Sequence, residues 1–509
     1  MVDLPDAGPL ATFARLDLAI RHQIHMRPDA SAIVDGGTIF SYSDLETLID
    51  GTAAWLDDLE GSENRIGILI DNSIEAVVAI LACIQIGRTV VPINTKNDPA
   101  TVCHIVEDAG IGVLIVSPKT ATDDAEEIFG TKVATLSAGD WPSGTYLAET
   151  DQPSDEALIY YTSGSTGKPK GVVVSHRTLV LGADSVAQYL NVRAKQRIGA
   201  VLPISFDAGL NWVMTGLCQG AEVHLMRYIF PKSLANDLAK HKIEALLAVP
   251  SVFFALSTVS APDDHAVKTM ASTGGRMDAS IVRTLLDAYD GMQFVVMYGL
   301  TEAFRATYLP PAQWEDNQGA IGRAIPHAAV HIIREDGTEA ADGEIGEIVQ
   351  SGPLVSLGYL NRPDAMKDRF GPCPAASPYA SKHPIAVYSG DFGTRDKNGI
   401  FTYVGRKDRL IKSRGFRIAP EEIEKAVVRY CGIKKNVVLG KDDLSAGQRI
   451  ILVVETAEAA SHNLASIREA LRPHIAVYML PDAICTLDRF PLNANGKFDV
   501  NQIARLADL

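Results

Sequence analysis

The stretch RIGILIDNSIEAVVAILACIQIGRTVVPIN, residues 65–94, places one long apolar-rich segment between two short apolar runs. The runs IGILID (66–71) and TVVPIN (89–94) have the length of strands, and the segment between them has the length of a helix. A strand–helix–strand order predicts a parallel sheet that is covered by helices on both faces. The stretch therefore predicts the α/β fold class.

The same rhythm continues outward from this stretch. Strand-length and helix-length segments alternate again between residues 198 and 299. After about residue 329, the runs AVHIIREDG and GEIGEIVQSG predict an antiparallel hairpin. Beyond residue 405 a helix, two strands and a second helix predict a C-terminal α+β unit of about 100 residues, which is an ordinary domain size.

The charge composition of the chain argues against some classes of binding partner. The chain has 509 residues, with 62 Asp and Glu against 47 Lys and Arg, and a formal net charge of −15. We expect no nucleic-acid or membrane partner, because proteins that bind nucleic acids or anionic membrane surfaces carry an excess of Lys and Arg. In addition, no apolar run approaches the ~20 residues that a membrane helix needs. The six cysteines never fall at CxxC spacing. The N-terminus does not resemble a signal peptide, so we expect a cytoplasmic protein.

The motif YYTSGSTGKPKG, residues 160–171, carries the strongest local chemical signal. An apolar run leads into a loop rich in glycine, hydroxyl groups and lysine, and the free backbone N–H groups of such a loop bind anions. The motif is not a Walker P-loop, because Pro169 follows Lys168 where that motif requires Ser or Thr. A polar turn without a ligand is the alternative for this loop taken alone.

Six motifs in a fixed order make the chain resemble the adenylate-forming superfamily, which contains acyl-CoA synthetases, adenylation domains of nonribosomal peptide synthesis and luciferases. They are residues 161–171, STGGRM (272–277), YGLTE (298–302), YSGD (388–391), YVGRKDRLIKSRGFRIAPEEIE (403–424) and PLNANGK (491–497). Within the superfamily the chain is most similar to stand-alone amino acid adenylation enzymes and to AMP-forming ligases associated with exosortase systems. The resemblance implies a large N-terminal domain, residues 1–407, with two α/β-layered sheets and a β-barrel-like part. A small mobile α+β domain, residues 408–509, would rotate about a hinge at Asp408.

The resemblance also implies a reaction. A carboxylate is joined to the AMP part of ATP, pyrophosphate leaves, and the acyl group then passes to a thiol. Neutralising the two anions that meet in the first step is the main catalytic demand. Glu302 would hold Mg²⁺, Thr301 would contact the α-phosphate, and Lys497 would reach the carboxylate–phosphate junction. The other implied ATP-binding residues contact the phosphates, the adenine and the ribose: Thr162, Ser163, Thr166, Lys170, Gly274, Gly275, Arg276, Met297, Tyr298, Gly299, Asp391, Tyr403 and Arg406.

The segment VLPISFDAGLNW bears on the substrate. Asp207 stands where many acyl-CoA synthetases of the superfamily carry a histidine or another aromatic residue, and an aspartate in this region of amino-acid-activating members pairs with the substrate ammonium. Arg305 matches a specificity-pocket position and is suited to a second carboxylate. Phe206 and Asn211 complete the predicted substrate-binding set. The alternative is an Asp207–Arg305 salt bridge in the empty protein, since a buried carboxylate needs a partner.

We therefore expect an amino acid substrate, with acidic and β-amino acids as candidates. The chain ends at Leu509, soon after Lys497, so we expect the acceptor to be the phosphopantetheine of a separate carrier protein or CoA. An acyl-CoA ligase for a non-amino carboxylate is the alternative enzyme. A non-catalytic nucleotide-binding protein is the alternative from another class, and the presence of Lys497, Glu302 and Asp391 argues against it.

Overall fold

The computed structural model describes residues 8–61, 64–146, 155–162, 169–406, 409, 411–413, 416–418, 420–443, 447–459, 463–492 and 498–509. The chain divides into two compact units: Met1–Val330 with Val349–Val387, and His331–Ile348 with Tyr388–Leu509. The predicted boundary between residues 407 and 408, and with it the Asp408 hinge, lies outside the described residues and stays a prediction.

The first unit contains a nine-stranded sheet in the order β15-β14-β13-β12-β11-β9-β10-β1-β2. Its middle strands run parallel, and β2, β14 and β15 pair antiparallel at the two edges. The strands are β1 (Ser31–Asp35), β2 (Thr38–Ser41), β9 (Arg197–Ala200), β10 (Glu222–Leu225), β11 (Ala245–Ala248), β12 (Thr269–Ser272), β13 (Gln293–Tyr298), β14 (Thr307–Leu309) and β15 (Arg323–Ala324).

A seven-stranded sheet has the order β18-β8-β7-β4-β3-β5-β6. Its strands are β3 (Arg65–Leu69), β4 (Val90–Pro92), β5 (Ile111–Val116), β6 (Lys132–Thr135), β7 (Glu156–Thr162), β8 (Lys170–Ser175) and β18 (Gly358–Tyr359). The strand–helix–strand prediction is confirmed, because β3 and β4 pair in parallel, with Ile66 beside Val90, and α3 (Ile74–Gln85) connects them.

One hydrophobic core joins the two sheets. It contains Ile33 and Ile198 from the nine-stranded sheet, Ile66 and Leu158 from the seven-stranded sheet, and the helices packed with them. These helices are α1 (Leu16–Met26), α2 (Tyr42–Asp57), α3, α6 (His176–Leu190) and α7 (Asp207–Gln219). Every residue of α3 except Glu75 is buried, as expected of a helix that is apolar on all sides and enclosed between other elements.

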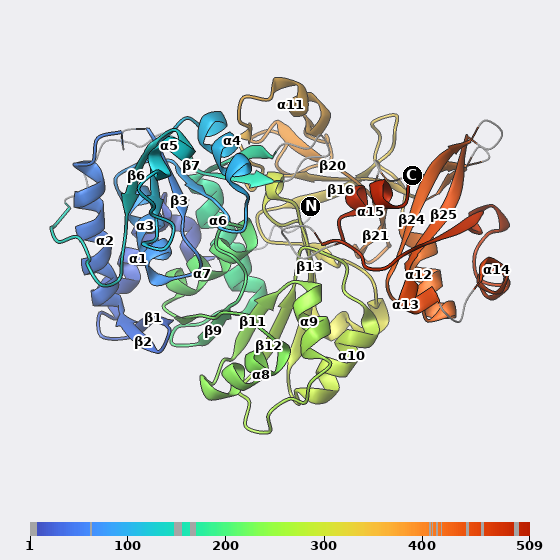
Figure 1. Cartoon of the computed structure of the whole chain (residues 1–509), viewed down its shortest axis with the longest axis horizontal. Coiled ribbons are helices and arrows are strands. Elements are labelled where there is room, and N and C mark those ends of the chain that lie inside the picture. Colours follow the sequence, from blue (N-terminus) through green and yellow to red (C-terminus); the bar gives the residue numbers. More distant parts are fainter. Residues whose placement is uncertain are drawn as a thin grey trace. The chain divides into compact units, whose positions relative to one another are not determined.

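The outer faces of both sheets are also covered. The helices α8 (Pro231–Lys240), α9 (Pro250–Leu256) and α10 (Ala279–Ala288) share a second core with β11, β12 and β13, beside which they lie in Figure 1. A third core joins α4 (Pro99–Ala109) and α5 (Ala125–Phe129) to the seven-stranded sheet. The first unit therefore consists of alternating helical and sheet layers, which confirms the expected α/β architecture.

A smaller sheet of five strands follows, in the order β16-β17-β20-β19 with β21 paired to β20. Its strands are β16 (Ala329–Ile333), β17 (Gly346–Ser351), β19 (Phe370–Pro372), β20 (Ile385–Arg395) and β21 (Phe401–Arg406), and α11 (Pro363–Arg369) precedes β19. The boundaries between the two units fall inside β16, β17 and β20. The antiparallel pairing of β20 with β19 and β21 fits the predicted change to an antiparallel region.

The C-terminal part of the second unit is a mixed sheet in the order β23-β22-β25-β24, with β26 parallel to β25. Alternate residues of β25 face two cores: Leu452 packs with α12 and α14, and Val453 with α15. The elements are β22 (Ile411–Ser413), β23 (Phe416–Ile418), α12 (Pro420–Cys431), β24 (Asn436–Asp443), β25 (Gly447–Glu455), α13 (Thr456–Ala459), α14 (Leu464–Leu471), β26 (Ala483–Leu487) and α15 (Val500–Leu506). Within the described part of the chain, no helix has both the length and the apolar character that crossing a membrane requires.

Candidate active site

The ends of the predicted phosphate loop belong to a β-hairpin. Strands β7 and β8 pair antiparallel, and their last paired residues are Thr162 and Lys170. Ser163 and Thr166, which stand between them, lie outside the described residues. The register places Thr162 and Lys170 side by side at the loop end of the hairpin, so the two residues that flank the loop are neighbours.

Tyr359 connects Glu302 to this end of the hairpin. Tyr359 belongs to β18, which pairs with β8 (Tyr359 beside Val172), and its hydroxyl donates a hydrogen bond to the Glu302 carboxylate. Lys170 Nζ lies 5.9 Å from the centre of the same Tyr359 ring. The backbone is held as well, because Ser356 N donates to Glu302 O at 2.9 Å. A lysine and a carboxylate that are 132 positions apart in sequence thus share one tyrosine, and Thr301 directly precedes that carboxylate.

The Glu302 carboxylate is the one protein ligand that the resemblance implies for Mg²⁺. Among the described residues, no group of three or more His, Cys, Asp or Glu side chains is placed to hold a metal ion. A cation bound at Glu302 would take its other ligands from phosphate and water. Mg²⁺ has this preference, since it commonly keeps several waters and binds through one or two carboxylates plus substrate phosphates.

The predicted adenine-binding residues lie at one edge of the nine-stranded sheet. Strands β12 and β13 are parallel with Ser272 beside Val296, so their carboxyl ends meet at the same edge. Gly274, Gly275 and Arg276 are exposed just beyond β12, and Met297 and Tyr298 end β13. A Cβ on Gly299 would approach Arg305 Cα to 2.7 Å, so glycine is required by the close passage of the backbone there.

The predicted ribose-binding residues belong to the second unit and meet across one strand pair. Asp391 on β20 lies opposite Arg406 on β21, and Arg406 Nε is 3.6 Å from Asp391 Oδ1. Burial raises the pKa of the Tyr403 phenol, and the carboxylates of Asp391 and Glu421 raise it further. Lys497 lies outside the described residues, so its role stays a prediction.

Asp207 is the first residue of α7, with Phe206 as the N-cap. The helix dipole favours a carboxylate at this end, and Asp207 Oδ1 accepts a hydrogen bond from Ala208 N at 2.6 Å. Asn211 follows one turn later on the same face and is buried at 4% exposure. Two of the predicted substrate-binding residues, Asp207 and Asn211, therefore lie on one face of α7.

Arg305 is 3% exposed. Both Arg305 and Asp207 belong to the described part of the chain, and they form no ion pair with each other. The alternative of an Asp207–Arg305 salt bridge is therefore not supported. Both residues act on the fully buried Tyr160 of β7: burial is the main cause that raises the pKa of Tyr160, the Asp207 carboxylate raises it further, and Arg305 lowers it. The charges of Asp207 and Arg305 thus both influence the same buried tyrosine, and the two side chains form no ion pair with each other.

Two protein-family profiles match this chain. The profile of the AMP-binding enzyme family matches residues 20–360, and the profile of the AMP-binding enzyme C-terminal domain matches residues 422–497. The chain belongs to the AMP-binding enzyme family. The first match contains the β7–β8 hairpin, Asp207, Glu302 and Arg305, and the second ends at Lys497.

Relatives of this AMP-binding enzyme include large peptide synthetases. It is 30% identical over 94% of its length to bacitracin synthase 3 of Bacillus licheniformis and 28% identical over 97% to surfactin synthase subunit 2 of Bacillus subtilis. The chain spans only 7% and 14% of the lengths of these two proteins.

Two solved structures share the fold of this AMP-binding enzyme. MatB from Rhodopseudomonas palustris, bound to ATP, has a TM-score of 0.86 at 24% identity, covering 97% of this chain and 98% of that one. o-Succinylbenzoate CoA synthetase from Bacillus subtilis, with its acyl-adenylate, has a TM-score of 0.82 at 23% identity, covering 95% and 97%. The adenylate-forming fold predicted from the six motifs is thereby confirmed.

Sequence reasoning missed several residues of the site. Tyr359, which links Lys170 to Glu302, carries no motif signal beyond its position on a strand. Tyr160 opens the motif of residues 160–171, but nothing in the motif indicates that it lies near Asp207 and Arg305. Tyr189 also belongs here, because its hydroxyl donates to Met297 Sδ at 3.1 Å and its ring stacks on Tyr308 at 4.7 Å. Only tertiary contacts identify these aromatic side chains.

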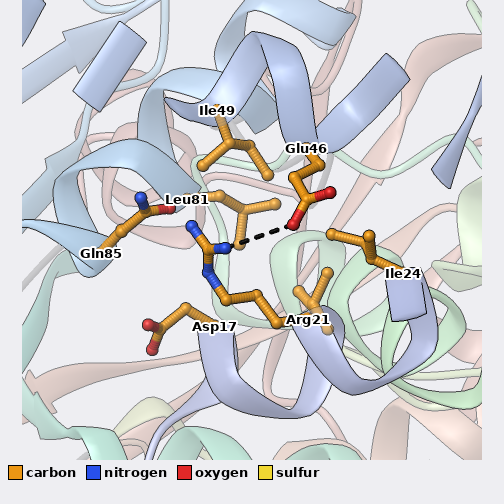
Figure 2. Close-up of a pocket in the computed structure, with 8 residues that line it drawn as sticks. Asp17, Arg21, Ile24, Glu46, Ile49, Leu81 and Gln85 are labelled. Atoms are coloured by element: carbon orange, nitrogen blue, oxygen red, sulfur yellow. Dashed lines mark hydrogen bonds and ion pairs between the residues drawn. The ribbon is translucent and has the colours of Figure 1, made fainter. Parts of the chain in front are cut away.

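A hollow in the first unit lies apart from these residues (Figure 2). It is lined by side chains of α1, α2 and α3: Asp17, Ile20, Arg21, Ile24, Glu46, Ile49, Leu81 and Gln85. The Arg21 guanidinium binds Glu46 at 3.3 Å and Asp50 at 2.6 Å, so its charge is satisfied within the protein. None of the predicted site residues lines this hollow.

Proposed function

We propose that this AMP-binding enzyme activates an amino acid as its acyl adenylate and transfers the acyl group to the phosphopantetheine thiol of a separate carrier protein. The observation that carries the amino acid assignment is Asp207, a carboxylate at the start of α7 for which no cationic partner is found among the described residues. A substrate ammonium supplies that partner. The relationship to peptide synthetases supports the same substrate class.

In the first step, a carboxylate oxygen of the substrate attacks the α-phosphorus of ATP. The new O–P bond forms as the bond to pyrophosphate breaks, and pyrophosphate leaves with the electron pair. Thr162, Ser163, Thr166 and Lys170 would bind the outer phosphates, while Thr301 and Lys497 would stabilise charge on the α-phosphate. Glu302, held by Tyr359, would anchor Mg²⁺, which neutralises phosphate charge when bound.

The nucleoside would be held by two residue groups. The turn at Gly274, Gly275 and Arg276 together with Met297, Tyr298 and Gly299 would flank the adenine. Asp391 would accept hydrogen bonds from the ribose hydroxyls, for which an ionised carboxylate has enough acceptor sites, and Tyr403 and Arg406 would complete the ribose and phosphate contacts.

In the second step, the thiol sulfur attacks the acyl carbon, the bond from that carbon to the phosphate oxygen breaks, and AMP leaves. The thiol loses its proton in the process. The small C-terminal domain, residues 408–509, would rotate between the steps about a hinge at Asp408, which is the gating motion that the proposal requires.

ATP–pyrophosphate exchange tests the substrate assignment. A panel of amino acids, the matching acids without the amino group, fatty acids and aryl acids should give exchange only with amino acids. The Asp207→Asn variant keeps the size of the side chain and should lower exchange about 10- to 100-fold, the worth of a hydrogen-bonded charge. Equal exchange with the deaminated acids would favour the alternative, an acyl-CoA ligase for a non-amino carboxylate.

The acceptor is tested separately with the best acid from that panel. A phosphopantetheine-bearing carrier protein and free CoA are offered in parallel, and the acylated products are identified by intact mass. Acylation of the carrier alone supports the proposal. Formation of acyl-CoA alone would replace the carrier protein by CoA.

A further inference from the structure

We propose that Arg305 binds a second carboxylate of the substrate, so that the amino acid activated by this enzyme is an amino dicarboxylic acid. The inference rests on the proposed function and adds the chemical class of the substrate side chain. It depends on three observations of the first unit: how the Arg305 backbone is held, which guanidinium nitrogens lack partners, and where Asp207 lies.

The backbone around Arg305 is held in an unusual conformation. Phe304 has φ 62° and ψ −89°, a conformation that residues other than glycine rarely adopt. Gln350 Nε2 fixes it from both sides, donating to Ala303 O at 2.9 Å and to Arg305 O at 2.7 Å. Ala306 N donates to Tyr298 O at 2.9 Å. These contacts stabilise a strained turn that sets the direction of the Arg305 side chain.

The Arg305 guanidinium is buried with an unused pair of donors. Its side chain lies against the Phe304 ring, with Cζ 5.3 Å from the ring centre, and Nε and Nη2 have no hydrogen-bond partner among the described residues. In two other arginines of this protein, Nε and Nη2 together bind one carboxylate side-on. In Arg15 both nitrogens lie 3.0 Å from the Asp17 oxygens, and in Arg334 they lie 2.8 and 2.5 Å from the Glu344 oxygens. A buried cation without an anion is costly, and the unused pair has the spacing of a carboxylate.

The surroundings favour an organic carboxylate over a phosphate group. Tyr189 is a neighbour of Arg305: burial raises the pKa of Tyr189 to about 12, and the charge of Arg305 and its side-chain hydrogen bond to Tyr189 oppose that rise. Tyr189 in turn contacts Met297 and Tyr308. This enclosed aromatic setting differs from the hairpin end at Lys170 and Glu302, where we place the triphosphate. Asp207 acts on the same Tyr160 as Arg305, so one molecule with an ammonium and a carboxylate can meet both.

The chemistry of the reaction identifies which carboxylate Arg305 binds. The reacting carboxylate loses its charge when it becomes an acyl phosphate, so an arginine paired with it would lose its partner after the first step. A side-chain carboxylate keeps its charge through both steps. Arg305 therefore pairs with the carboxylate that does not react, and the substrate carries an ammonium and two carboxylates.

Pyrophosphate exchange with matched pairs tests the inference. Aspartate, glutamate and 2-aminoadipate are compared with asparagine, glutamine and other amino acids of similar size but no second charge. The wild-type protein should prefer one of the acids to its amide by about 10- to 100-fold in kcat/KM. Arg305→Met should remove most of that preference through KM and retain exchange with the amide, and Arg305→Lys, which keeps the charge without the side-on pair, should lie between them.

The control is Arg65→Met, which removes an arginine bound to Glu156 at 3.0 Å near the opposite end of β7. It should keep the acid preference of the wild-type protein. If Arg305→Met does not fold, the preference of the wild-type protein decides alone. Exchange with neutral amino acids at equal efficiency would overturn the inference and leave the proposed function standing, whereas exchange with no amino acid would overturn the proposed function itself.

Discussion

His176, the first residue of α6, makes the first unit sensitive to acid. It follows the N-cap Ser175 at the end of β8, it is 5% exposed, and neither ring nitrogen has a hydrogen-bond partner among the described residues. Burial lowers the pKa of His176 to about 4 from an ordinary 6.5, and the charge of Arg15 adds to this, while Asp17 and Asp155 oppose it. The folded protein therefore holds this imidazole neutral at pH values where the unfolded chain protonates it.

The sign and the size of the effect follow from these two pKa values. Between pH 6.5 and 4 the unfolded state binds more protons, so the free energy of unfolding falls as the pH falls. At pH 5 the unfolded state gains a factor of roughly 30 over the folded state, which is about 2 kcal/mol. At pH 7 the corresponding loss is only about 0.2 kcal/mol.

Urea unfolding of the intact protein at pH 7 and at pH 5 measures this loss. The wild-type protein should lose about 2 kcal/mol more between the two pH values than the His176→Leu variant, which carries no titrating group at this site. The matched control is His25→Leu, a change at an exposed histidine, and it should behave like the wild-type protein. Equal losses in the wild-type protein and in His176→Leu would refute the assignment of acid sensitivity to this residue.

Two further predictions concern the site. Tyr359→Phe removes the donor to the Glu302 carboxylate and should lower the pyrophosphate exchange rate about 10-fold and raise the Mg²⁺ concentration needed for half-maximal rate, because a hydrogen bond to a charged group is worth ~1.5–3 kcal/mol. A variant with unchanged Mg²⁺ dependence would separate Tyr359 from the metal site. Gly299→Ala places a Cβ 2.7 Å from Arg305 Cα and should cost ~1–3 kcal/mol in unfolding free energy and weaken the preference for acidic substrates. Gly139→Ala, whose Cβ would come no closer than 3.8 Å to a neighbouring atom, is the control, and similar denaturation midpoints for the two variants would contradict the steric argument.

Much of the fold could be predicted because its signals are local. The apolar runs on either side of α3 predicted the parallel pair β3 and β4, and the alternation between residues 198 and 299 predicted the parallel strands of the nine-stranded sheet. The order of the six motifs was sufficient to identify the family. The packing of two sheets around one set of helices could not be predicted in the same way. The near-complete burial of α3 depends on elements from distant parts of the chain, which no local pattern indicates.

The candidate site divides in the same way. The sequence by itself determined which residues carry charge, hydroxyl groups and backbone freedom, since residue type and spacing are local properties. Tertiary structure alone decided that Tyr359 joins Lys170 to Glu302, that Asp207 and Arg305 do not pair, and that Arg305 is buried with two free donors. Those contacts depend on how strands and turns more than 50 residues apart in sequence pack together. The same packing sets the burial and the partners of each charged group, and these determine how strongly the group interacts with a ligand.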